Sequence, residues 1–145
     1  MRVGLGNDHR GVDLKNKIID YFNKKGIEYK NYGCDVKESV DFVDYAVKLC
    51  NGVLSKEVDL GILVCGTGIG MSIAANKIKG IYAAKVSSPR EASLCREHND
   101  ANVMTLSENT ENLEEILDNF LNTEASTVEK YRARVDKIKA IEGGY

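Results

Sequence analysis

The sequence lacks several patterns that would assign it to a particular class of protein. No apolar run approaches the roughly 20 residues that a membrane-spanning helix needs. Neither sign of charge is in excess, because 20 basic residues face 22 acidic ones, so a nucleic-acid-binding surface is not expected. Internal repeats and low-complexity linkers are also absent. A chain of 145 residues with this composition predicts one globular domain over residues 1–145.

The cysteines do not follow a metal-binding or disulfide pattern. They are spread widely, at Cys34, Cys50, Cys65 and Cys95, and form no Cys-x-x-Cys pair, so neither structural zinc nor a disulfide framework is predicted. The first residues enter a strand-like run directly and have no signal-peptide layout. We therefore expect a cytoplasmic protein without a bound metal.

Short apolar runs alternate with amphipathic patterns along the whole chain. Strands are predicted over residues 2–6, 27–32, 59–64, 81–86 and 101–106. Helices are predicted over residues 12–25, 41–54, 71–79, 89–97, 110–121 and 126–141. This alternation predicts an α/β fold, a three-layer α/β/α sandwich with a Rossmann-like five-stranded parallel sheet. Ligands of such sheets bind beyond the carboxyl ends of the strands.

The most informative stretch is a glycine-rich turn that follows a buried apolar run, Gly61-Ile62-Leu63-Val64-Cys65-Gly66-Thr67-Gly68-Ile69-Gly70. Glycines at alternate positions let the backbone approach a ligand closely and point N–H groups at it. Cys65 stands just before a predicted helix, where the helix dipole and free N–H donors favour the thiolate over the thiol. The turn therefore predicts a reactive thiol that faces an anion site.

Better-known glycine loops do not fit this turn. A Walker A loop needs Gly-Lys followed by Ser or Thr, and the sequence contains no such triplet. A dinucleotide-binding loop needs a glycine where Met71 stands, and a cysteine phosphatase would need an arginine at that same position. The alternative that stays open is a tight turn with a passive cysteine.

Both histidines stand at the ends of predicted elements. His9 follows Asp8 after the first strand, and His98 follows the fourth helix. We expect both to border one cleft at the edge of the sheet. Lys130 and Arg134 lie four positions apart on the last predicted helix, so they share a face that suits a phosphate, with a solvated charged face as the alternative.

Four blocks of the sequence resemble the type B ribose-5-phosphate isomerases, which belong with galactose-6-phosphate isomerase subunits and allose-6-phosphate isomerase. The blocks are residues 7–11, 38–46, 65–79 and 96–103, and the resemblance continues in register to Ile138. It implies a cofactor-independent aldose–ketose isomerase of a phosphorylated sugar. Ribose 5-phosphate is the expected substrate, in the non-oxidative pentose phosphate pathway. A six-carbon sugar phosphate and a silent sugar-phosphate-binding subunit are the alternatives.

The resemblance also implies a role for each site residue. Cys65 would move a proton from C2 to C1 of the sugar through an enediolate, and the N–H groups of Gly66, Gly68 and Gly70 would bind its oxygen. Thr67 would bond to Cys65 or to the substrate, and His98 would open the sugar ring. The remaining expected substrate ligands are Asp8, His9, Arg10, Asn99, Lys130 and Arg134. Family members are dimers or tetramers whose sites are shared between subunits, with the C-terminal helix packed on a partner.

At three places near the predicted site, the sequence departs from the pattern of the family. Arg10 stands where a small residue is common, and is expected either to lie over the phosphate or to narrow the pocket. Ser87-Ser88 replace a stretch that often holds a cysteine and an aspartate, and Lys130-Tyr131 replace an Arg-His pair. All three border the predicted site, so they bear on which sugar phosphate fits.

Overall fold

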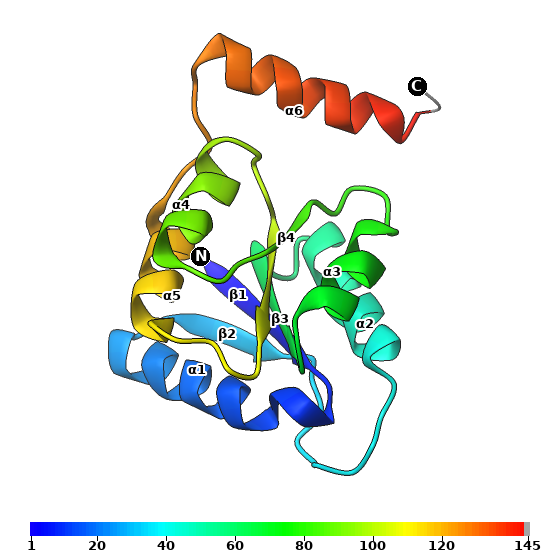
Figure 1. Cartoon of the computed structure of the whole chain (residues 1–145), viewed down its shortest axis with the longest axis vertical. Helices are drawn as coiled ribbons and strands as arrows, with labels where there is room; N and C mark the ends of the chain where they lie inside the picture. The colour runs from blue at the N-terminus through cyan, green and yellow to red at the C-terminus, as the bar shows by residue number, and fades with distance from the viewer. Residues whose placement is uncertain (144–145) are drawn as a thin grey trace.

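A parallel sheet forms the middle layer of the computed structural model, which describes residues 1–143 (Figure 1). The sheet consists of β1 (Arg2–Asn7), β2 (Glu28–Asn31), β3 (Leu60–Cys65), β4 (Ala83–Lys85) and β5 (Val103–Ser107). The strand order is β2-β1-β3-β5-β4, and every pair is parallel. All residues of β3 are buried, because this central strand is covered by helices on both faces.

Helices cover both faces of the sheet and build a separate core on each side. The face with the larger core carries α1 (Val12–Lys25), α4 (Pro89–Glu97) and α5 (Leu113–Asn122). The opposite face carries α2 (Phe42–Leu54) and α3 (Ile69–Asn76). The predicted α/β/α sandwich is therefore confirmed, and no helix within residues 1–143 is long and apolar enough to cross a membrane.

The last helix, α6 (Glu129–Ile141), stands apart from these layers (Figure 1). None of its residues is buried in the chain. It touches the rest of the molecule through a few side chains, including the stack of Tyr131 on His98 and a Lys139–Asp100 ion pair at 3.9 Å. A helix with so little buried surface draws little of its stability from this chain.

Several predicted boundaries were wrong, each because a local hydrogen bond competes with the regular element. Strand β4 is shorter than predicted, since the Ile81 N–H donates to the Ile78 carbonyl in a turn. Helix α5 starts at Leu113, because Thr110 instead closes a turn onto the Ser107 carbonyl. Helix α6 starts at Glu129, because the Ser126 N–H donates to the Glu97 carbonyl.

Candidate active site

The candidate site lies where the carboxyl ends of β1 and β3 meet. These strands are neighbours, and Asn7 of β1 is paired with Val64 of β3. After β1 the chain continues into α1 on one face of the sheet, and after β3 it continues into α3 on the opposite face. The loops after these two neighbouring strands therefore turn away from each other. Asp8 and Cys65 follow these paired residues directly. This is the position at which open α/β sheets bind ligands.

The Cys65 thiol is held by the turn that follows it. Cys65 is only 6% exposed, and the N–H of Gly68 donates to its Sγ at 3.1 Å. Gly68 has a φ of +78° and is the N-cap of α3, and a Cβ there would lie 3.0 Å from the Leu106 carbonyl carbon. Only glycine therefore fits the conformation that aims this N–H at the sulfur. The Gly68 N–H and the start of α3 therefore lie against the sulfur.

The glycines of the turn do not all leave space for a ligand, which corrects the expectation drawn from their spacing. A Cβ on Gly70 would lie 2.9 Å from the Phe42 ring, so this glycine serves packing between α3 and α2. Only Gly66 is open, with no heavy atom closer than 3.8 Å to such a Cβ. Thr67 does not bond to Cys65 here, because its Oγ1 accepts the N–H of Ile69 at 3.1 Å.

A short 3₁₀ turn over His9–Gly11 arranges the polar residues after β1. The carboxylate of Asp8 accepts the N–H groups of Arg10 at 3.0 Å and Gly11 at 3.2 Å, which fixes this turn. His9 Nδ1 accepts the N–H of Val40 at 3.2 Å. A neutral His9 must therefore carry its proton on Nε2.

Arg10 forms an ion pair with Glu108, a pairing that the sequence analysis did not predict. Its Nε and Nη2 donate to the two carboxylate oxygens of Glu108, each at 2.7 Å. This bidentate ion pair raises the pKa of Arg10 and lowers that of Glu108. The pair lies beside the open Gly66. Glu108 already neutralises the Arg10 guanidinium. The geometry therefore favours the role in which Arg10 narrows the pocket, rather than the role in which it binds the phosphate.

A hollow of about 360 Å³ opens next to this pair. It is lined by His9, Arg10, Asp13, Leu14, Lys37, Glu108 and Asn109. Its wall thus combines an imidazole and an amide with two cations that are each paired with a carboxylate, which suits a hydroxylated ligand.

His98 does not lie near Cys65 within one chain, so the expectation of one cleft bordered by both histidines was wrong. In the sheet, Val103 pairs with Gly61 and Ser107 pairs with Cys65, while His98 precedes β5. The four steps from Gly61 to Cys65 span about 13 Å at roughly 3.3 Å per residue. His98 and its neighbour Asn99 therefore lie towards the amino ends of the strands, away from Cys65.

The structure does bring His98 together with the cations of α6. The His98 ring stacks on Tyr131 with centroids 4.1 Å apart and planes inclined by 10°. Lys130 Nζ and Arg134 Cζ lie 5.0 Å and 5.9 Å from the centre of the same Tyr131 ring. The predicted site residues thus form two half-sites. The first is the Cys65 half-site (Asp8, His9, Arg10 and residues 65–70), and the second is the His98 half-site (His98, Asn99, Lys130, Tyr131 and Arg134).

Two of the other cysteines, Cys50 and Cys95, are buried in the hydrophobic cores on the two faces of the sheet. Burial raises the pKa of Cys50 to about 12 and that of Cys95 to about 11, so both stay thiols at neutral pH. Within residues 1–143, no group of three or more His, Cys, Asp or Glu side chains is arranged to hold a metal ion.

Comparisons with known proteins agree with the fold. A family model described as Ribose/Galactose Isomerase matches residues 3–138. Ribose-5-phosphate isomerase B of Escherichia coli is 39% identical over 144 residues, which cover 97% of this chain and 96% of that protein. A structure of Clostridium thermocellum ribose-5-phosphate isomerase B is 42% identical, with a TM-score of 0.94, over 100% of this chain and 99% of that one.

A second solved structure is that of Mycoplasma genitalium ribose-5-phosphate isomerase B with bound ribulose 5-phosphate. It is 33% identical to this chain, with a TM-score of 0.89, and the match covers 99% of this chain and 97% of that one. The chain therefore belongs to the ribose/galactose isomerase family, as one of its type B ribose-5-phosphate isomerases, and is an isomerase.

Proposed function

We propose that this protein interconverts ribose 5-phosphate and ribulose 5-phosphate, with Cys65 as the group that moves the proton. The observation that carries the proposal is the contact between the Gly68 N–H and Cys65 Sγ at the carboxyl end of β3. A thiolate held next to backbone donors and polar side chains suits proton abstraction beside a carbonyl, which needs a base active near neutral pH. The reaction belongs to the non-oxidative branch of the pentose phosphate pathway.

The proposed chemistry balances without a redox partner. Cys65 Sγ takes the proton from C2 of the open-chain aldose, and the electron pair of that bond forms the C1–C2 double bond of an enediolate. Backbone N–H groups around the open Gly66 stabilise the negative oxygen, as preorganised donors do best. The proton on Sγ exchanges with solvent while the enediolate is bound, and Sγ then delivers a proton to C1, while the proton of the C2 hydroxyl passes to the oxygen on C1. His98 opens the ring of the sugar before these steps.

We further propose that two copies of the chain complete each site. Two observations support this arrangement, of which the first is the split into the Cys65 and His98 half-sites. The second is an exposed apolar face over α2 and α3, where four aliphatic side chains are 40–60% exposed and three of them, all but Ile69, line a hollow of about 370 Å³. These side chains are Val43, Val47, Ile69 and Ile73. In a homodimer, or in a tetramer built from dimers, the His98 half-site of one copy supplies Asn99, Lys130 and Arg134 to the Cys65 half-site of another.

The Arg10–Glu108 pair favours a five-carbon substrate over a six-carbon one. A sugar phosphate with one more carbon needs extra depth between the reacting carbons and the phosphate. The ion pair occupies space beside the open Gly66, with the Arg10 and Glu108 side chains 3.8 Å from where a Cβ there would lie. A six-carbon sugar phosphate such as allose 6-phosphate or galactose 6-phosphate is the second candidate substrate.

A substrate panel on matched cysteine variants tests the proposal. Wild type is expected to turn over ribose 5-phosphate without added metal and to incorporate solvent deuterium at C1 or C2. Cys65→Ala is expected to abolish turnover, whereas Cys95→Ala, at a cysteine with the same 6% exposure, is expected to retain it. Undiminished turnover by Cys65→Ala contradicts the mechanism. Binding of sugar phosphate without deuterium incorporation by wild type indicates a silent binding subunit instead.

A further inference from the structure

Lys15 is a charged side chain buried in the core side of α1. It is only 1% exposed, and lysine is rarely buried so fully unless it is paired. It stands on the apolar stripe of α1, in helical register with Ile18, Ile19 and Phe22. Its Nζ donates to the Cys34 carbonyl at 2.6 Å and to the carboxylate of Asp35. The lysine therefore reaches through the core to one point in the loop after β2.

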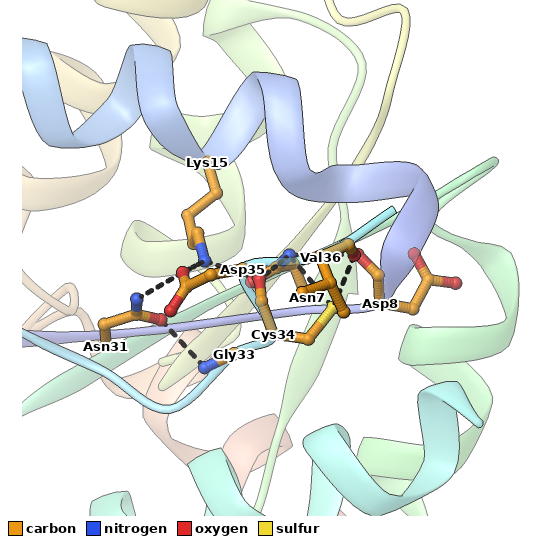
Figure 2. Close-up of polar contacts among 8 residues, drawn as sticks. All are labelled: Asn7, Asp8, Lys15, Asn31, Gly33, Cys34, Asp35 and Val36. Carbon is orange, nitrogen blue, oxygen red and sulfur yellow. Dashed lines mark hydrogen bonds and ion pairs between the residues drawn. The ribbon is translucent and has the colours of Figure 1, made fainter. Parts of the chain in front are cut away.

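Asn7, which comes from β1, donates with its side chain to the same Cys34 carbonyl (Figure 2). Its side chain is fully buried, and its Nδ2 donates to the carbonyls of Asp8 and Cys34, each at 2.9 Å. Gly33 permits this fit, because a Cβ there would lie 1.7 Å from Asn7 Oδ1. The Cys34 carbonyl thus accepts hydrogen bonds from two buried donors that come from β1 and α1.

The anchored loop carries the group that orients His9. Residues 32–41 form neither helix nor strand, and Val40 near their end donates its N–H to His9 Nδ1. A further contact of this loop is a Lys37–Asp13 ion pair whose side chains are 67% and 74% exposed. Such exposed pairs contribute little. The loop is therefore held at its start by the anchor at Cys34 and at its end by Asp41, which caps α2 by accepting the Val43 N–H at 3.0 Å, and Val40 lies between the two.

We propose that Lys15 and Asn7 are positioning residues for His9. By clamping the Cys34 carbonyl, they hold the loop so that the Val40 N–H meets Nδ1 and keeps the imidazole proton on Nε2. Nε2–H is then preset to donate to a sugar hydroxyl. The catalytic consequence rests on the proposed function, whereas the effect on the His9 tautomer does not.

Nitrogen-15 NMR of the imidazole rings tests this directly, since the chain has only two histidines. Lys15→Met keeps the length of the side chain and suits the apolar stripe but removes the donors. Lys24→Met is the matched control, because Lys24 is also on α1 and pairs with Glu114 at 2.8 Å but is 59% exposed. Wild type and Lys24→Met are expected to show His9 as the Nε2–H tautomer. Lys15→Met is expected to show a mixture of tautomers, with His98 unchanged.

Kinetics on the same variants separates positioning from general loss of structure. If His9 binds the sugar in both the ground state and the transition state, Lys15→Met raises KM about three- to tenfold, as the loss of one hydrogen bond predicts, and leaves kcat nearly unchanged. An unchanged His9 spectrum in folded Lys15→Met overturns the proposal. If Lys15→Met does not fold, Asn7→Ala removes the other donor to the Cys34 carbonyl, and an unchanged His9 spectrum there overturns the proposal equally. Absence of any isomerase activity in wild type counts against the proposed function alone, because the tautomer is read without substrate.

Discussion

Replacing Gly68 by alanine tests the link between the backbone of the turn and the chemistry of Cys65. The residue combines a φ of +78° with a site for Cβ that lies 3.0 Å from the Leu106 carbonyl carbon and 3.1 Å from its oxygen. Both neighbouring atoms belong to the backbone of β5, so neither can rotate away. The turn must shift by a few tenths of an ångström, and the Gly68 N–H then leaves its place 3.1 Å from Cys65 Sγ.

The size of the effect follows from these two contacts. A left-handed conformation costs an alanine about 1–2 kcal/mol, and the backbone contact adds strain, so we expect Gly68→Ala to lower the free energy of unfolding by about 2–3 kcal/mol. A lost hydrogen bond to a charged acceptor costs about 1.5–3 kcal/mol, which corresponds to a fall of about 10- to 100-fold in kcat/KM.

Gly26→Ala is the matched control for this prediction. Gly26 has a similar φ of +69° but no heavy atom within 4 Å of a Cβ, and it lies at the far end of α1. The free energy of unfolding of Gly26→Ala is expected to fall by about 1–2 kcal/mol, and its activity is expected to stay at the wild-type level. Urea unfolding, isomerase kinetics and the rate of Cys65 alkylation by iodoacetamide measure the three quantities. A folded Gly68→Ala protein with the kcat/KM and alkylation rate of Gly26→Ala would refute the reasoning.

Three further predictions concern the two ends of the sheet. Tyr131→Ala removes the ring stacked 4.1 Å from His98 and is expected to lower kcat/KM about two- to tenfold, as the loss of an aromatic pair predicts, whereas Tyr131→Phe keeps the stack and the activity. Glu108→Gln frees Arg10 from the wall of the site, so the ratio of kcat/KM for ribose 5-phosphate to that for allose 6-phosphate is expected to fall; an unchanged ratio shows that the pair does not select the sugar. Arg10 lowers the folded-state pKa of Glu108 below its ordinary 4.5, so the pair stabilises the protein above that pH and this contribution disappears as the pH falls through the lowered pKa. Urea unfolding across this acidic range is therefore expected to show a smaller loss of stability in Glu108→Gln than in wild type.

The features that were predicted correctly are those encoded within a short stretch of sequence. The apolar run before Cys65 is long enough to identify a buried strand, and the glycines after it mark a turn. The order of strands and helices follows from the same local patterns. Position in the sequence also placed Asp8 correctly, because a residue after a parallel strand must lie at the carboxyl edge of the sheet.

The features that were missed depend on which residues meet in space. Arg10 and Glu108 are 98 positions apart, and no local pattern pairs them. His98 was assigned to the wrong edge of the sheet because a residue at the end of a helix that returns along the sheet lies near the start of the next strand. Lys15 did leave a signal, since a lysine on the apolar stripe of α1 needs a buried partner.

Complementation between two inactive variants tests the central claim, that Cys65 of one copy works with His98 of another. Cys65→Ala and His98→Asn proteins are each expected to be inactive as homodimers. When they are unfolded and refolded together, each mixed dimer holds one site with both groups and one site with neither. Random pairing makes about half of the dimers mixed, so the account predicts recovery of about a quarter of wild-type turnover. A mixture that stays as inactive as its separate components would contradict a site shared between two copies.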